Sequence, residues 1–267
     1  MKRIEEAFRA AKRVGRATFI PYITAGDPNL EATVELVRAL AGSGADVVEL
    51  GVPFSDPIAD GPTNQRAAER ALAAGTTLTG VLAAVEVIRQ DLEIPIVLFT
   101  YANPVVRYGI DRFAEDASAA GIDGVLFTDV PAEEMTPFEE SLSADGLDLI
   151  MLATPTSGRR RMKAAARFGG GFLYLVSRTG VTGARKDLDS ALGANVRAAR
   201  KASKLPVAVG FGISSPEQVA RVAALANGVV VGSAIVSRIG ALGACDELVN
   251  EIESFAAELA AACKKKS

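Results

Sequence analysis

Histidine is absent from the 267-residue sequence, which contains only two cysteines. Without an imidazole, Ser-His-Asp relays, Cys-His pairs and histidine-ligated zinc sites are all excluded. Cys245 and Cys263 are too far apart for a Cys-x-x-Cys pair, so neither a redox motif nor a thiolate metal cage is encoded. We therefore expect no metal site, free thiols in a reducing cytoplasm, and proton transfer by carboxylates.

The sequence also lacks an excess of basic residues and any long apolar run. A formal net charge of -3 argues against nucleic acid or an anionic membrane as the main partner. Glu5 and Glu6 follow Met1-Lys2-Arg3 before any apolar stretch, so we expect no signal peptide. No segment approaches the roughly 20 uninterrupted apolar residues of a membrane-spanning helix. These features predict a cytoplasmic protein.

Short apolar runs rich in β-branched residues alternate with segments of helical periodicity, a pattern typical of βα units around a parallel sheet. The eight predicted strands are 19–23, 47–50, 96–101, 124–128, 147–152, 172–176, 207–211 and 228–231. The helices predicted between them are 30–41, 65–74, 78–90, 111–120, 133–144, 159–167, 188–203 and 216–225. Further helices at 5–14 and 246–263 are expected to cap and close the barrel.

The length of 267 residues and the 49% hydrophobic content suit one (β/α)₈ barrel, a fold of roughly 250 residues. No linker-like tract divides the chain. We therefore predict the α/β class and a single TIM-barrel domain over residues 1–267, with a frayed tail at 264–267.

Glu49 ends the second predicted strand within the apolar run Val47-Val48-Glu49-Leu50-Gly51. An ionised carboxylate is costly there unless it is used. Asp60 follows in a loop whose prolines and glycine fix the backbone. Both acids fall on the face where TIM barrels hold their chemistry. They are either an acid/base pair or structural acids that bind backbone groups and cap a turn.

Glycines end strands seven and eight, in the stretches 210–216 and 232–235. TIM barrels build phosphate sites there from backbone N–H groups. Neither stretch contains Lys or Arg, so an anion would be held by amide dipoles and a short helix starting near Ser233. The pattern predicts a phosphorylated substrate; glycines that only relieve crowding are the alternative.

The segment 177–186, after strand six, is long, polar and punctuated by glycine. Such a loop is typical of a lid that closes over a substrate, and a disordered connector is the alternative. The lysines fall on predicted helices, loops or termini, which argues against a Schiff-base aldolase. A carbon–carbon lyase would therefore need a substrate that stabilises its own charge, and an indole ring could do so.

Further motifs lie at the ends of predicted strands. They read ELGVPFSDP (49–57) with ADGP (59–62), YANP (101–104), DVP (129–131), SRTGVTG (177–183) and GFGIS (210–214). With these motifs, the chain resembles the alpha subunits of tryptophan synthase over nearly its whole length. The first motif is highly specific, whereas the phosphate glycines alone would fit many barrels.

The resemblance implies a retro-aldol cleavage of indole-3-glycerol phosphate to indole and glyceraldehyde 3-phosphate. By the family pattern, Asp60 accepts the indole N–H, and Glu49 delivers a proton to indole C3 and takes one from the side-chain hydroxyl. Burial should raise the pKa of Glu49 enough for both tasks.

The resemblance also assigns the residues around the substrate. The indole pocket would be lined by Tyr22, Phe99, Leu126, Tyr174 and Phe211, and Thr182 of the lid would close onto Asp60. The phosphate would be held by Gly183, Gly212, Gly232 and Ser233. Tyr22 and Thr128 are more polar than the family pattern leads us to expect.

Family members work with a beta subunit that carries pyridoxal phosphate, in an α₂β₂ complex, so we expect this partner and no cofactor in the present chain. The matching docking residues are Pro53, Asp56, Asn103, Pro104 and Pro131. Without the resemblance, these prolines would be taken only to stiffen loops.

Two other functions remain in view. One is a same-fold enzyme such as indole-3-glycerol phosphate synthase, although no lysine lies on a predicted strand where ring closure would need it. The other is a non-catalytic allosteric subunit that binds a phosphorylated ligand and activates a partner. Retention of both acids favours the lyase.

Overall fold

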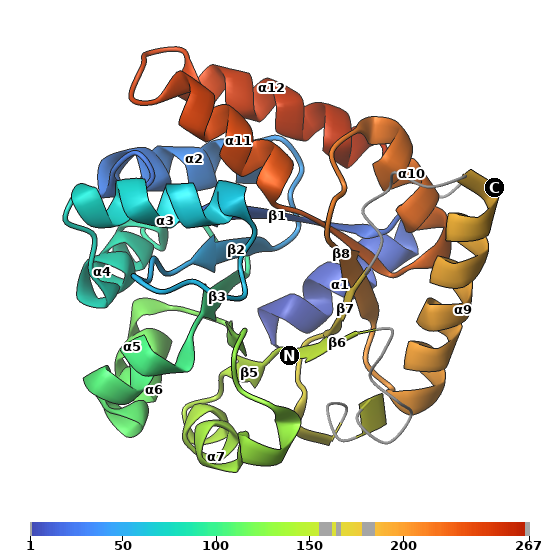
Figure 1. Ribbon diagram of the computed structural model, residues 1–267, viewed down its shortest axis with the longest axis horizontal. Coiled ribbons are helices and arrows are strands. Elements are labelled where there is room, and N and C mark those ends of the chain that lie inside the picture. The colour runs from blue at the N-terminus through green and yellow to red at the C-terminus, as the bar shows by residue number, and fades with distance from the viewer. Residues whose placement is uncertain (1, 155–161, 164–166, 178–184, 265–267) are drawn as a thin grey trace.

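The computed structural model describes residues 2–154, 162–163, 167–177 and 185–264, and Figure 1 shows parallel strands surrounded by helices. The strands are β1 (Thr18–Thr24), β2 (Val48–Gly51), β3 (Ile96–Thr100), β4 (Gly124–Phe127), β5 (Asp148–Leu149), β6 (Met151–Ala153), β7 (Leu173–Val176), β8 (Val207–Gly210) and β9 (Gly228–Val231). The helices before β5 are α1 (Arg3–Arg13), α2 (Leu30–Gly42), α3 (Pro62–Ala73), α4 (Leu78–Ile88), α5 (Ala102–Tyr108), α6 (Ile110–Ala120), the 3₁₀ turn η1 (Ala132–Glu134) and α7 (Thr136–Ala144). Those after it are α9 (Arg185–Ala202), α10 (Pro216–Leu225), α11 (Ser233–Leu242) and α12 (Leu248–Ala261).

The strands close into a barrel. Their order is β5-β4-β3-β2-β1-β9-β8-β7-β6, and neighbouring strands pair in parallel. Only Ile150 separates β5 from β6, and its N–H donates to the Val125 carbonyl at 2.8 Å. The two short strands are therefore consecutive parts of one barrel strand, which joins the two ends of the sheet. The predicted (β/α)₈ barrel is confirmed, and each of the eight predicted strands is present.

Some helix boundaries differ from the sequence prediction. Helix α3 begins at Pro62 and not at residue 65, because proline suits the first helical position, where no N–H bond is needed. Helix α7 begins at Thr136, after the short η1 turn, again with a proline in its first turn. Helix α5 was not predicted. Most of the helix predicted at 159–167 lies outside the described residues.

Side-chain alternation along the strands divides the core into two layers. On β2, Val48 and Leu50 pack outward against the helices. Val47, just before this strand, packs inside the barrel. Because successive side chains point to opposite faces of a strand, Glu49 lies on the same inner face as Val47, two residues closer to the carboxyl end. The alternation along the strand therefore points this acid into the barrel.

Helix α1 packs against the inner core at the amino-terminal end of the barrel. Ile4 and Phe8 are buried in the inner core, and the Phe8 ring lies 5.4 Å from the ring of Phe172. At the other terminus Lys264 forms an isolated bridge with Arg16. The tail predicted to fray from 264 therefore still has a backbone partner at that residue, and residues 265–267 lie outside the described residues.

Two aspartates at the amino-terminal end of the barrel each bind a strand N–H and an arginine. Asp46 accepts the Phe19 N–H at 2.8 Å and a bond from Arg16 Nη2 at 2.6 Å. Asp123 accepts the Ile96 N–H at 2.9 Å and a bond from Arg89 Nη2 at 2.8 Å. Each aspartate therefore joins a backbone N–H to an arginine, a fully satisfied arrangement for a buried charge.

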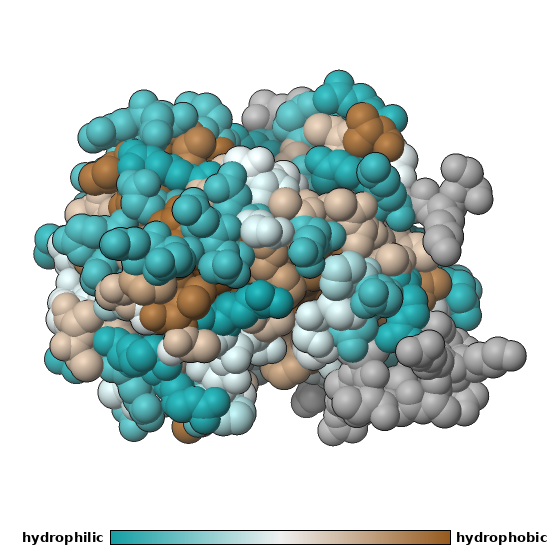
Figure 2. All heavy atoms as spheres, turned by 90° about the horizontal axis from the view of Figure 1, so that it is seen from above, coloured by the Kyte–Doolittle hydropathy of each residue, from teal (hydrophilic) through white to brown (hydrophobic). Residues whose placement is uncertain are grey.

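The face of the molecule on the side of α11 and α12 carries many hydrophilic residues (Figure 2). Figure 2, seen from the side of α11 and α12, shows single hydrophobic residues scattered among polar ones. This is the pattern of helices that bury one face. Within the described residues, no single helix is long and apolar enough to cross a membrane, and α3 with α4 reaches that length and composition only across a 92° bend.

Candidate active site

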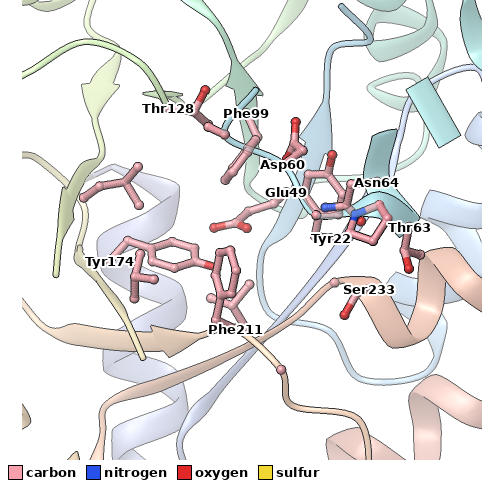
Figure 3. A pocket seen from close by; sticks show the side chains of 18 residues that line it. Tyr22, Glu49, Asp60, Thr63, Asn64, Phe99, Thr128, Tyr174, Phe211 and Ser233 are labelled. Atoms are coloured by element: carbon pink, nitrogen blue, oxygen red, sulfur yellow. The ribbon is translucent and has the colours of Figure 1, made fainter. Parts of the chain in front are cut away.

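A cavity of about 430 Å³ opens at the carboxyl ends of the strands. Its lining residues are Tyr22, Glu49, Ala59, Asp60, Gly61, Pro62, Thr63, Asn64, Phe99, Thr128, Leu152, Tyr174, Val176, Phe211, Gly212, Val230, Gly232 and Ser233. In Figure 3 the Glu49 side chain points into the space between Phe99, Tyr174 and Phe211. The volume suits a small organic ligand, since such pockets span roughly 300–1,000 Å³.

Glu49 is fully buried on β2, where it pairs in register with Tyr22 of β1 and Val97 of β3. Neither of its carboxyl oxygens has a hydrogen-bond partner within the described part of the chain. Burial raises the pKa of Glu49 from an ordinary 4.5 to about 8. The group is therefore mostly protonated near neutral pH and can donate a proton and then take one back.

Asp60 lies between β2 and α3 and is only half-buried. The Tyr101 hydroxyl donates to Asp60 Oδ2 at 2.9 Å. The backbone of Asp60 is held as well, because its N–H donates to the Pro57 carbonyl and its carbonyl accepts from Gln65 Nε2. Burial raises the pKa of Asp60, and hydrogen bonds from Tyr101 and Asn64 oppose that rise. These bonds favour the ionised form, so Asp60 is suited to accept a proton or an N–H.

Two tyrosines form much of the cavity wall, each beside a glycine. A Cβ atom on Gly51 would lie 2.2 Å from the Tyr22 hydroxyl oxygen, and one on Gly210 would lie 2.1 Å from that of Tyr174. Neither glycine can carry a side chain unless its tyrosine moves. The Tyr22 ring meets Phe99 edge to face, with centroids 5.2 Å apart. These rings form an apolar wall suited to a flat aromatic ligand.

Backbone forms a further part of the cavity lining. Phe211 has φ 99° and Gly212 has φ 70°, so two consecutive residues after β8 take left-handed conformations. Phe211 is strained there, because a Cβ makes positive φ unfavourable. Gly232 precedes the ten-residue helix α11, whose first N–H groups have no partner inside the helix. Of the described residues that line the cavity, none is Lys or Arg. Backbone dipoles are the positive groups available to an anion here.

The same cavity brings together most of the residues selected from the sequence. These are Tyr22, Glu49, Asp60, Phe99, Tyr174, Phe211, Gly212, Gly232 and Ser233. Thr182 and Gly183, with most of the proposed lid, lie outside the described residues.

Comparison with known proteins identifies the family. A model of the family described as tryptophan synthase alpha chain matches residues 8–265. This chain belongs to that family.

Curated relatives agree along nearly the full length. The tryptophan synthase alpha chains of Solibacter usitatus and Geobacter sulfurreducens are each 52% identical over 259 residues, covering 97% of this chain and 97% and 98% of theirs. Among solved structures, the Legionella pneumophila alpha chain has a TM-score of 0.90 at 38% identity, covering 98% of this chain and 97% of that one. A chain of Mycobacterium tuberculosis tryptophan synthase has a TM-score of 0.89 at 37% identity, with 99% of each chain covered.

One residue predicted to line the indole pocket lies deeper in the barrel than the cavity. Leu126 is fully buried in the inner core and does not line the cavity. Thr128, two residues further along the same inner face, does line it. The strand period alone does not distinguish these two positions, because the sequence does not show at which layer the packed interior ends.

Other lining residues were missed from the sequence. Leu152, Val176 and Val230 occupy inward positions near the carboxyl ends of three strands, which the strand period could have identified. Asn64 lies in the first turn of α3, and its buried Oδ1 has no hydrogen-bond partner in the described residues. The sequence shows Tyr101 only as part of a motif. Its bond to Asp60 depends on a contact between two loops that no sequence pattern reveals.

The residues proposed for docking differ in exposure. Asp56, Asn103 and Pro131 are exposed and Pro104 is half-buried. Asn103 and Pro104 lie in the first turn of α5. Pro53 is buried just after the end of β2, and its part in docking stays a prediction.

Proposed function

We propose that this chain cleaves indole-3-glycerol phosphate to indole and glyceraldehyde 3-phosphate, as its place in the tryptophan synthase alpha chain family leads us to expect. One observation carries the proposal. A buried glutamic acid with a pKa of about 8 shares a cavity with a second carboxyl group that accepts a hydrogen bond at 2.9 Å. Two acids in such different environments can take opposite roles in one reaction.

In the proposed complex, the indole ring lies among Tyr22, Phe99, Tyr174 and Phe211, and the phosphate lies against Gly212, Gly232 and Ser233. The aromatic wall supports the first assignment. The second is supported by the N-terminus of α11 and the left-handed turn at Phe211 and Gly212. Thr182 and Gly183 of the lid are proposed to close over the substrate, Thr182 against Asp60.

The chemistry needs one proton to enter and one to leave. Protonated Glu49 donates to indole C3, and the positive charge that develops on the ring nitrogen is stabilised as Asp60 accepts the ring N–H. The Glu49 carboxylate then takes the proton of the side-chain hydroxyl. The C–C bond breaks, its electron pair returns to the ring as neutral indole, and the aldehyde is released. Glu49 ends protonated, as it began.

We also propose that the product indole passes to a beta subunit that carries pyridoxal phosphate, in an α₂β₂ complex in the cytoplasm. Asp56, Asn103, Pro104 and Pro131 are proposed as docking residues, and no cofactor is expected in this chain. Three of these residues are exposed, and each follows the carboxyl end of a strand. Ile58, in the loop that carries Asp60, is 86% exposed, and a partner surface would cover its apolar side chain.

The test is indole release from indole-3-glycerol phosphate by the purified chain, measured alone and with a tryptophan synthase beta chain. We expect release in both cases. If indole is absent from both reactions while the substrate binds and raises beta-chain turnover, the chain is a non-catalytic allosteric subunit. If the substrate neither binds nor reacts, the proposed function is wrong.

A further inference from the structure

Asp60 is the less securely placed of the two acids. It lies outside the strands, in the connection between β2 and α3, and it is half-buried, whereas Glu49 is fixed within a strand. If the proposed function holds, Asp60 must nevertheless present one particular oxygen to the ring N–H. A misplacement of about 1 Å can lower a rate by roughly a hundredfold. Some neighbouring group must therefore hold the carboxylate.

Tyr101 forms hydrogen bonds with two consecutive residues of the connection between β2 and α3. Its hydroxyl oxygen accepts the Ala59 N–H at 3.0 Å and donates to Asp60 Oδ2 at 2.9 Å. A phenol has one proton, and the Ala59 N–H can only donate. The hydroxyl proton is therefore available to Asp60, and the ionised carboxylate accepts it.

The phenol ring is itself held in place. Tyr101 follows β3 directly, is only 3% exposed, and stacks against Phe54 with ring centroids 5.2 Å apart. Phe54 belongs to the same connection as Asp60, so the ring and the hydroxyl of Tyr101 contact that connection at two separate places. Tyr101 and the Asn64 amide each donate to the carboxylate, whose two oxygens together accept more than two bonds, so Asp60 can still accept a bond from a ligand. The bond to Oδ2 also favours the carboxylate over the acid, because Tyr101 donates to it.

We propose that Tyr101 is a positioning residue for Asp60: its hydroxyl fastens Oδ2, which keeps the carboxylate ionised and oriented to accept the ring N–H of the substrate. The inference rests on the proposed lyase function. Tyr101 does not touch the substrate in this arrangement, since it does not line the cavity. It acts through the direction and the ionisation state of Asp60.

The direct test is Tyr101→Phe, which keeps the ring contact with Phe54 and removes only the hydroxyl. Hydrogen bonds to charged groups are worth enough that we expect kcat/KM for indole release to fall by about tenfold to a hundredfold. The acidic limb of the pH profile should also move to higher pH, because Asp60 loses a donor that favours its ionised form. The alkaline limb, which depends on Glu49, should stay in place.

Tyr108→Phe is the matched control. Its hydroxyl also donates to an aspartate, Asp116 Oδ2, at 2.5 Å, but on α6, away from the cavity. The same deletion there should leave both the rate and the pH profile unchanged. A loss caused only by looser packing would lower Tm without moving the acidic limb, so Tm is measured for each variant.

A double-mutant cycle with Asp60→Asn gives a second, independent result. If Tyr101 acts through Asp60, then Tyr101→Phe should have little further effect once the carboxylate is gone. Equal effects in both backgrounds would overturn the inference, as would an unchanged acidic limb in Tyr101→Phe. Failure of the wild type and of Tyr108→Phe to release indole would instead overturn the proposed function itself.

Discussion

The acids at the two ends of the barrel have opposite surroundings. At the amino-terminal end, Asp46 and Asp123 each accept a backbone N–H and an arginine. At the carboxyl end, Glu49 has no partner within the described residues, and Asp60 is held by a phenol and an amide. The first pair has its hydrogen-bonding needs met by the fold, whereas the second pair is left available for a ligand.

The presence or absence of hydrogen-bond partners distinguishes carboxylates that stabilise the fold from those proposed to react with a substrate, and it does so more clearly than burial. Burial raises the pKa of Asp123 as well as that of Glu49, yet only Asp123 has ion-pair partners to oppose the rise. A buried acid without a donor is costly to the fold and is retained for what it does. We therefore expect changes at the carboxyl end to alter turnover and changes at the amino-terminal end to alter stability.

The largest effect is expected from removing the acids of the cavity. Glu49→Gln and Asp60→Asn should each lower kcat for indole release by at least about a hundredfold, the scale of lost general acid–base catalysis. Steady-state assays with indole-3-glycerol phosphate measure this. Glu140→Gln, at an exposed position on α7, is the control and should keep the wild-type rate. A near-wild-type rate in either cavity variant removes that residue from the mechanism.

The next effect is on stability, and it depends on pH. Between pH 4.5 and about pH 8, Glu49 is protonated in the native state, whereas the unfolded chain has released that proton. The free energy of unfolding therefore falls as pH rises through this window. Glutamine does not titrate, so Glu49→Gln does not lose stability in this way. Between about pH 4 and pH 9 its free energy of unfolding should rise by roughly 3–5 kcal/mol relative to that of the wild type, at about 1.4 kcal/mol per unit of pKa shift.

Urea unfolding of both proteins across this pH range measures the gain. The glutamine variant should be the more stable protein at alkaline pH even though it is the slower enzyme. Parallel stability curves for the two proteins would contradict the view that Glu49 is buried in its protonated form.

The smallest of these effects is expected at the opposite end of the barrel. Asp123→Asn leaves the nearly buried Arg89 guanidinium without its charged partner, which should lower the free energy of unfolding by roughly 3 kcal/mol. Turnover per folded molecule should be unchanged, because Asp123 is not among the residues that line the cavity. Urea unfolding and the indole assay are run on the same preparation. A large drop in turnover with unchanged stability would erase the distinction between the two ends.

The fold was predictable because its signals are local. Short apolar runs rich in β-branched residues marked the strands, and the glycines at 210, 212 and 232 marked the ends of the last two strands. The missed helix α5 shows the limit of such signals. Its start, Tyr101-Ala102-Asn103-Pro104, resembles a loop in sequence, although proline is well tolerated in a first helical turn.

The site was predictable only where a motif marked it. Glu49, Asp60 and the phosphate glycines at 212 and 232 were identified from the sequence and lie in one cavity. Leu126 lies in the packed inner core and not in the cavity lining, and Pro53 is buried just after β2. Both observations concern depth within the packed structure. Depth depends on where neighbouring strands and loops end, which is a property of the assembled barrel.

The sequence by itself determined the barrel and its inward-facing acid, and its lack of histidine left proton transfer to carboxylates. These features could be predicted because the pattern and the composition can be read from each segment alone. Only the tertiary structure decided which acids have partners. The bonds from Tyr101 to Ala59 and Asp60 join residues far apart in the sequence, and Glu49 is isolated by the strands on either side of it. Hydrogen bonds and desolvation act through space, so the chemical character of a carboxylate is settled only when the chain has closed around it.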